Sequence, residues 1–301
     1  MKALRLTETG VCLDCNVELP SLDEEYNVLV KVFYAGVCKT DIAIARNLIP
    51  AKKGVTLGHE FCGKIVDILN DQNNARGLKI GETVSANPMQ FGNTGDLMCG
   101  KEINGCFAEY IRLPAKNIVK LGDKLLNPLG AFLEPVAASL APYKYIPSKA
   151  PRIGIYGDSR IARLTYQIGK ILNLSPELIH DDRLLTPNHY DFLIETEISN
   201  PKPLLDSLKY GGTLILKSRN FNIISIVPND IAMKEFKILG ARYGDFTLSK
   251  ELLLKSLTTE DPNLNFRKLF GKTYTLENFK TAFETADSKE SKKIFFKICA
   301  E

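Results

Sequence analysis

The chain has 301 residues, enough to bury a large core and to form two domains or one large one. Its composition is ordinary for a soluble globular protein, with 45% hydrophobic and 25% charged residues. The formal net charge of +4 comes from basic residues scattered among almost as many acidic ones, so no basic block points to nucleic acid or to an anionic membrane.

The start of the chain does not have the pattern of a secretory signal. Arg5 and Glu8 lie where such a signal needs an apolar run, and no stretch approaches the roughly 20 apolar residues of a membrane span. Seven cysteines without regular spacing fit reduced thiols better than a disulfide framework. We therefore expect a cytoplasmic protein with no nucleic-acid partner and no membrane partner.

The first part of the chain, to about Pro114, has short apolar segments separated by glycine and proline. Such segments are typical of β-strands. The predicted strands are 27–35, 61–67, 107–113 and, entered through a turn, 79–85. This half is predicted to be mostly β.

After Leu129 the sequence pattern changes to one that predicts alternating helices and strands. A helical pattern at 130–141 is followed by three prolines that mark a boundary, Pro142, Pro147 and Pro151. The expected order is then strand 152–156, helix 160–172, strand 177–181, strand 190–195, helix 203–208 and strand 212–216. This alternation predicts a parallel sheet. A tail helix at 276–285 and a tail strand at 292–298 are expected to return to the first domain.

Three short motifs supply the side chains of a zinc site. Cys38 comes from GVCKTD at 36–41, His59 and Glu60 from GHE at 58–60, and Glu134 from LEP at 133–135. A thiolate, a neutral imidazole and a carboxylate leave one tetrahedral position open for water or substrate, as in a catalytic zinc site. Taken alone, Cys38 would more often be a small buried hydrophobe and Glu134 a surface charge.

A β-rich half with these motifs, followed by a βαβ unit, resembles the medium-chain zinc-dependent alcohol dehydrogenase superfamily, and within it the polyol and threonine dehydrogenase branch. The resemblance covers nearly the whole chain. It implies an α/β protein with a β-rich GroES-like catalytic domain, 1–142 and 268–301, and a shortened Rossmann-type parallel-sheet cofactor domain, 143–267. It also implies a small-molecule alcohol or ketone substrate and a homodimer or homotetramer.

The resemblance also implies roles for the motif residues. Cys38 and His59 would be zinc ligands, and Glu60 or Glu134 would supply the carboxylate, with exchange between the two as a further alternative. Asp41 would accept the other ring N–H of His59 and so fix the tautomer whose lone pair faces the metal.

Two further residues of the first motif are assigned in the same way. Thr40 would hydrogen-bond the alcohol and relay its proton, although its hydroxyl also suits a turn residue that bonds its own backbone. Lys39 would meet the cofactor pyrophosphate. Zinc would act as a Lewis acid while the carbinol carbon releases hydride to a nicotinamide.

Two other pairs of cysteines are not expected to bind metal. Cys12 and Cys15 lie in an alternating pattern that sends their side chains to opposite faces of a strand. Cys99 and Cys106 lie where family members often carry four cysteines around a structural zinc, and two cysteines cannot close such a site. We expect one catalytic zinc and no structural zinc.

The glycine-rich turn that would receive the pyrophosphate is altered. The sequence GDSRIA at 157–162 aligns with the pattern G-x-G-x-x-G. Gly157 is kept, whereas Ser159 replaces the second glycine and an alanine replaces the third. Arg160 would offset the negative charge of Asp158 by pairing with phosphate or with that aspartate. The expected cofactor-binding residues are Lys39, Gly157, Ser159, Arg160, Ile161 and Asp181.

The segment after the turn is also unusual. Asp181 ends the second strand, where an acid takes ribose hydroxyls, which favours NAD over NADP, although Arg183 opposes that choice. Only eight residues separate Asp181 from Tyr190, whereas a crossover with its helix needs at least about 10–12. We predict that one helix and one strand of the sheet are missing.

Two hypotheses follow. The first is a zinc-dependent oxidoreductase that transfers hydride between a secondary alcohol, of the polyol or amino-alcohol type, and NAD(P). The second is a pseudoenzyme of the dehydrogenase fold that keeps zinc but has lost or altered dinucleotide binding, and acts as a binding or scaffold protein. The segment 157–190 distinguishes them.

Overall fold

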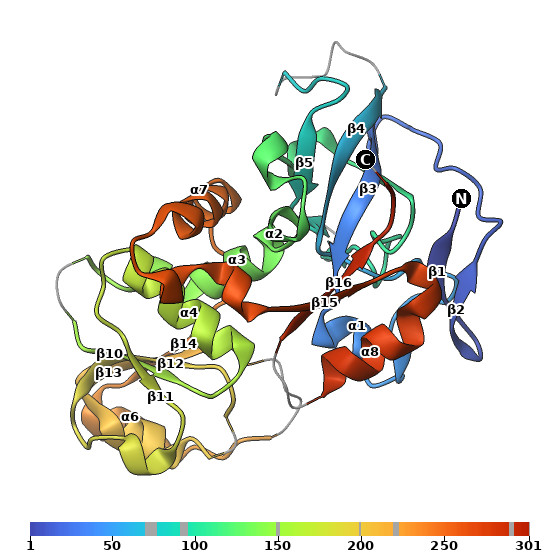
Figure 1. Ribbon diagram of the computed structural model, residues 1–301. Helices are drawn as coiled ribbons and strands as arrows, with labels where there is room; N and C mark the ends of the chain where they lie inside the picture. Colours follow the sequence, from blue (N-terminus) through green and yellow to red (C-terminus); the bar gives the residue numbers. More distant parts are fainter. Residues whose placement is uncertain are drawn as a thin grey trace. The chain divides into compact units, whose positions relative to one another are not determined.

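The computed structural model describes residues 1–69, 77–90, 96–148, 151–198, 200–218, 223–288 and 292–300. It divides into two compact units, unit 1 (Met1–Glu134 with Leu269–Glu301) and unit 2 (Pro135–Lys268). The mixed α/β class is confirmed (Figure 1). The domain bounds given above stay predictions. Within the described ranges no helix is long and apolar enough to cross a membrane.

Unit 1 is built on a seven-stranded sheet in the order β15-β16-β3-β4-β5-β9, with β8 also paired to β3. These strands are β3 (Val28–Gly36), β4 (Phe61–Ile68), β5 (Thr83–Ala86), β8 (Tyr110–Leu113), β9 (Ile118–Lys120), β15 (Phe270–Tyr274) and β16 (Lys293–Lys297). The smaller pairs are β1 (Ala3–Thr7) with β2 (Gly10–Asp14) and β6 (Met89–Gln90) with β7 (Leu97–Met98). The mostly β character of this half is therefore confirmed.

The tail strand β16 lies between β3 and β15, so the chain returns to unit 1 as expected. Its aromatic residues enter the core. The rings of Phe296 and Phe107 pack edge to face there, with their centroids 5.0 Å apart. The predicted strand 107–113 begins only at Tyr110. Its first residues bond elsewhere, since Phe107 receives a hydrogen bond from Leu4 and donates one to Leu57.

Short helices complete unit 1. They are α1 (Lys39–Ala45), α2 (Pro128–Ala131), α8 (Phe279–Asp287) and the 3-10 helices η2 (Ala115–Asn117), η3 (Asp123–Leu125) and η8 (Leu276–Asn278). The single helix predicted at 130–141 is wrong, because α2 is followed by a separate helix, α3 (Leu133–Leu140). Pro135 has no N–H to donate to Ala131, and the helix breaks between them.

Unit 2 contains a parallel five-stranded sheet in the order β11-β10-β12-β13-β14. Its strands are β10 (Ile153–Tyr156), β11 (Glu177–Ile179), β12 (Tyr190–Glu195), β13 (Leu208–Leu216) and β14 (Lys237–Gly240). Its other helices are α4 (Arg160–Ile171), α5 (Lys202–Ser207), α6 (Pro228–Lys234), α7 (Phe246–Thr258), η4 (Ala141–Tyr145), η5 (Asp182–Leu184), η6 (Pro262–Leu264) and η7 (Phe266–Leu269). The parallel sheet predicted from the βαβ alternation is confirmed.

The connection from β11 to β12 is short. Every residue between Ile179 and Tyr190 is described, and the only helix there is the 3-10 helix η5. Strand β11 therefore forms an edge of the described sheet, next to β10. The predicted loss of the crossover helix is confirmed, and no described strand takes the position beyond β11.

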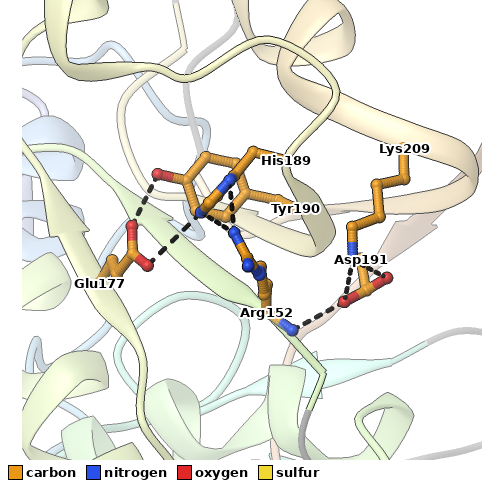
Figure 2. A network of polar contacts seen from close by, with 6 residues as sticks. All are labelled: Arg152, Glu177, His189, Tyr190, Asp191 and Lys209. Carbon is orange, nitrogen blue, oxygen red and sulfur yellow. Dashed lines mark hydrogen bonds and ion pairs between the residues drawn. The ribbon is translucent and has the colours of Figure 1, made fainter.

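A polar network links the amino ends of the first four sheet strands (Figure 2). Its members are Arg152, Glu177, His189, Tyr190, Asp191 and Lys209. The guanidinium of Arg152 lies 2.7 Å from Nδ1 of His189, and the Tyr190 hydroxyl donates to Glu177 at 2.9 Å. Lys209 pairs with Asp191 at 2.9 Å. The network holds the strand ends opposite to the glycine turn, which follows the carboxyl end of β10.

Candidate functional site

Two neighbouring strands bring the first two motifs together. Cys38 lies two residues after β3, and His59 and Glu60 immediately precede β4. Because β3 and β4 are antiparallel, with Ala35 opposite Phe61, the end of one strand lies beside the start of the other. The sheet register thus converts two distant motifs into one cluster.

The chain enters β4 through Gly58, whose backbone requires a glycine. Its φ of +93° lies in the region that L-residues avoid, and a Cβ there would overlap the ring of Phe107. The glycine therefore lets the next two residues, His59 and Glu60, turn toward Cys38.

Three donor groups converge in unit 1. A sulfur, nitrogen or oxygen atom from each of Cys38, His59 and Glu60 lies within 4.8 Å of the others. His59 and Glu60 are buried, with 2% and 1% of their surface exposed, and Cys38 is half-buried. One thiol, one imidazole and one carboxyl group form a donor set that suits zinc.

Asp41 supports two members of this cluster. One of its carboxylate oxygens accepts the backbone N–H of Cys38 at 2.9 Å, and the other lies 3.2 Å from Nδ1 of His59. Since Asp41 is fully buried, a proton on Nδ1 is the arrangement that satisfies both groups. Loss of the other ring proton then leaves the lone pair on Nε2, the atom that would bind a metal.

The buried groups shift one another's pKa. Burial raises the pKa of Glu60 to about 8, against the attraction of Lys293. Burial also opposes the thiolate of Cys38, but the hydrogen bond and charge of His59 lower the pKa of that thiol to about 6. Burial lowers the pKa of His59, yet Asp41 and Cys38 raise it well above its usual value. The cluster thus favours a Cys38 thiolate, the form that binds metal.

Lys293 was not anticipated from the sequence. It is fully buried at the start of β16 and forms an ion pair with Glu60. A Cβ at Gly36 would overlap Glu60 and approach Lys293, so that glycine makes room for the pair. The sequence feature that could have revealed this buried residue is a lysine directly before Ile-Phe-Phe, in a strand that has a neighbouring strand on each side.

The other predicted residues of unit 1 lie around the cluster. The Cys38 sulfur lies 3.6 Å from the hydroxyl oxygen of Thr40, and Lys39 is exposed at the start of α1. Glu134 is buried in α3, and its negative charge contributes to the raised pKa of Glu60, but it is not one of the three converging donors.

Four other cysteines are not among the converging donors, although the Cys106 thiol donates to the backbone carbonyl of Glu60 at 3.5 Å. Cys99 and Cys106 are free thiols within the core of unit 1, and burial raises the pKa of Cys99 to about 12. Cys12 and Cys15 are free and exposed.

The glycine turn of unit 2 has the backbone of an anion-binding site. It joins β10 to α4, with Gly157 at a φ of +130°. Ser159 is the N-cap of α4 and accepts the N–H of Ala162 at 3.3 Å. Arg160 and Ile161 form the first turn of that helix, whose N-terminus favours negative charge.

The side chains around this turn fit a dinucleotide less well than the backbone does. The N–H of Asp158 already donates to the carboxylate of Glu197 at 3.0 Å. The carboxylate of Asp158 pairs with Arg163 at 2.8 Å, so Arg163 offsets its charge. An incoming phosphate group would meet these groups at the turn.

Asp181 is held within its own turn. Its two carboxylate oxygens accept from the guanidinium of Arg183 at 2.9 and 2.6 Å, and this pairing lowers the pKa of Asp181. A hollow of about 250 Å³ lies beside the pair, lined also by His180 and Leu184. Asp181 does not end the strand as predicted, because β11 ends at Ile179 and Asp181 is the N-cap of η5. A ribose would compete with Arg183 for its carboxylate.

Comparison with known proteins shows what the chain is similar to. The alcohol dehydrogenase GroES-like domain matches residues 24–123. The L-threonine 3-dehydrogenase of Protochlamydia amoebophila is 25% identical over 351 aligned positions that cover 98% of both chains. Both similarities point to the medium-chain alcohol dehydrogenases.

Solved structures of the superfamily share the fold. A protein described as a zinc-binding dehydrogenase from Sinorhizobium meliloti 1021, with NADP bound, has a TM-score of 0.83 at 21% identity and covers 98% of both chains. The 2R,3R-butanediol dehydrogenase of Bacillus subtilis has a TM-score of 0.82 at 21% identity, covering 98% of this chain and 99% of its own. The predicted combination of a GroES-like part and a Rossmann-type part is confirmed.

Relative to the Protochlamydia dehydrogenase the present chain is reduced. The alignment with the Protochlamydia dehydrogenase is longer than the 301 residues of this chain, so parts of the relative have no counterpart here. The short connection between β11 and β12 is one place where the structure has less than a full βαβ crossover.

Proposed function

We propose that this protein is a zinc-dependent oxidoreductase that transfers hydride between a secondary alcohol, of the polyol or amino-alcohol type, and NAD(P). The observation that carries the proposal is the convergence of Cys38, His59 and Glu60, with Asp41 behind the imidazole. The names of its relatives support the substrate class, since L-threonine 3-dehydrogenase and 2R,3R-butanediol dehydrogenase both refer to small secondary alcohols.

The donor set fits one zinc ion. Zinc binds sulfur, nitrogen and oxygen at about 2.0–2.3 Å, so donors within 4.8 Å of one another can reach one ion through small side-chain rotations. Cys38 and His59 would be constant ligands. Glu60 lies closer to them but is paired with Lys293, so Glu60, Glu134 or both in exchange would supply the carboxylate. We propose no structural zinc.

The residues around the ion would each have a task. Bound zinc would supply a Lewis acid for the oxygen of the alcohol or ketone. Thr40, next to Cys38, would hydrogen-bond the substrate hydroxyl and relay its proton. Asp41 would keep His59 in the ligating tautomer. Lys39, exposed at the start of α1, would provide positive charge for a phosphate group.

The proposed cofactor is NAD rather than NADP, because an acid, Asp181, follows the second strand of the parallel sheet in unit 2 by two residues, near the place where an acid takes ribose hydroxyls. Gly157, Ser159, Arg160 and Ile161 would form the phosphate-binding turn. A cytoplasmic location and a homodimer or homotetramer stay predictions.

Metal analysis of the purified protein tests the metal centre. We expect one zinc per chain, and a loss of nearly all of it in Cys38→Ala, because a thiolate ligand is removed. The matched control is Cys12→Ala, which removes an exposed thiol and should leave the zinc content unchanged. Equal zinc in wild type and Cys38→Ala would remove Cys38 from the ligands.

One observation favours the second candidate, a pseudoenzyme that keeps zinc and acts as a binding or scaffold protein. The turn that should receive the dinucleotide is already engaged by Glu197. Titration with NADH and with NADPH to millimolar concentration separates the two candidates. Saturable binding supports the oxidoreductase, and absence of binding to either cofactor supports the pseudoenzyme.

A further inference from the structure

A carboxylate of the chain itself occupies the glycine turn of unit 2. Glu197 lies two residues beyond the end of β12, and its Oε2 accepts the backbone N–H of Asp158 at 3.0 Å. Backbone N–H groups at such turns bind the phosphate oxygens of dinucleotides. A carboxylate oxygen has the same sign of charge and the same ability to accept this hydrogen bond.

The space beside Gly157 is also taken. A glycine in this position leaves room for a phosphate group to approach the backbone. Here a Cβ built on Gly157 would overlap Oγ1 of Thr196, and would lie 3.3 Å from Oε2 and 3.5 Å from Cγ of Glu197. Two side chains of the same short segment therefore fill the side of Gly157 that lacks a Cβ.

The fold fixes this arrangement. Strands β10 and β12 are parallel neighbours, with Tyr156 opposite Glu195, so the residues after both strands lie side by side. Thr196 is tied back by two hydrogen bonds to the Tyr156 carbonyl, one from its hydroxyl at 3.0 Å and one from its N–H at 2.9 Å. The following residue, Glu197, therefore lies at the glycine turn.

We propose that Glu197 is an internal competitor of the cofactor, so that a dinucleotide binds only after this carboxylate has left the N–H of Asp158. This inference rests on the proposed function, because it takes NAD(P) as the ligand of the turn. It names Glu197 as the residue that sets the affinity.

The competitor is displaceable. Glu197 is exposed, so water can solvate its carboxylate once it swings away from the turn. The carboxylate of Asp158 does not take its place, because it is paired with Arg163. Removing Glu197 should therefore free the N–H and also remove one negative charge from the path of the pyrophosphate.

The test measures cofactor affinity rather than activity. Dissociation constants for NADH and NADPH are determined by calorimetry for wild type, Glu197→Ala and Glu197→Gln. We expect about tenfold tighter binding for Glu197→Ala, the effect of one hydrogen bond to a charged group at an exposed site. Glu197→Gln, which keeps an acceptor without the charge, should lie between the two.

The matched control is Glu251→Gln, which removes one exposed negative charge from helix α7 of the same unit. It should bind both cofactors like wild type. Measurable binding that is equal in wild type and Glu197→Ala overturns the inference and leaves the proposed function intact. Absence of binding in all four proteins overturns both the inference and the oxidoreductase proposal.

Discussion

The metal centre of unit 1 and the glycine turn of unit 2 were both expected from short motifs, yet the two sites differ in how far the structure agrees with the motif. In unit 1 three of the four predicted ligands converge, and a buried aspartate and a buried lysine hold two of them. In unit 2 the predicted backbone is present, but Glu197 is already bonded to it. A motif thus predicts the donors of a site better than it predicts whether the site is open.

The physical reason lies in what each site requires. A metal centre is made by side chains that the motif names, and neighbouring strand ends bring them together. A phosphate-binding turn is made by backbone and by empty space, and space depends on residues outside the motif. Thr196 and Glu197 are nearly 40 positions beyond Gly157 in the sequence.

The largest expected effect is in Lys293→Met. Breaking a buried ion pair costs about 3–5 kcal/mol, and we expect the lower end because Glu60, whose pKa is already raised to about 8, can take up a proton. Urea unfolding of the metal-free protein measures the change. Lys297→Met, at the exposed end of the same strand, should change the stability by less than about 0.5 kcal/mol. Similar losses of stability in Lys293→Met and Lys297→Met would show that the buried pair contributes no more than an exposed lysine of the same strand.

The next effect is expected in Asp41→Asn. Residues that orient a metal ligand typically contribute about 10–100-fold in metal affinity, and the asparagine can still accept the N–H of Cys38. Competition with a zinc chelator gives the affinity. Asp67→Asn, an exposed change on β4, should leave it unaltered. Wild-type affinity in Asp41→Asn would mean that Asp41 caps α1 without orienting His59.

A smaller effect is expected in the polar network of unit 2. Tyr190→Phe removes the hydrogen bond to Glu177 (Figure 2), which we expect to destabilise the protein by about 1 kcal/mol. Thermal unfolding detects this change. Tyr166→Phe on α4 serves as the control, expected within about 0.5 kcal/mol of wild type. No loss in Tyr190→Phe would leave the network without a measurable role in stability.

The smallest effect concerns the reactivity of Cys38. With a pKa of about 6, its thiolate forms between pH 5 and pH 7, so alkylation by iodoacetamide in metal-free protein should rise over that range and level off above it. At pH 7 the rate should exceed that of an ordinary thiol by only about twofold to threefold, because a low pKa also lowers nucleophilicity. Peptide mass spectrometry follows each cysteine separately.

Two comparisons sharpen this measurement. Cys62 and Cys99, whose pKa values burial raises to about 12, should stay unmodified at every pH tested while the protein is folded. Added zinc should slow the alkylation of Cys38 and of no other cysteine. A rate for Cys38 that still increases above pH 8 would contradict the lowered pKa.

Much of the fold could be predicted from local patterns. The strand 190–195 was predicted with the bounds it has in the structure, and the short spacing before it predicted the missing crossover helix. The helix 130–141 failed, because one proline at 135 outweighed an apolar pattern that continues through it. The spacing of apolar residues indicates which face of a helix is buried, but it does not show where a backbone hydrogen bond is lost.

The sequence by itself determined the donor types of the metal centre, the resemblance to a family and the shortened crossover, because these depend on residue identity and spacing. Only the tertiary structure decided that Lys293 pairs with Glu60, that Arg183 holds Asp181 and that Glu197 occupies the turn. Lys293 and Glu197 meet their partners through strand pairing, across a separation that no local pattern spans. Arg183 is only two residues from Asp181, yet which of the possible partners an exposed arginine takes is a matter of geometry.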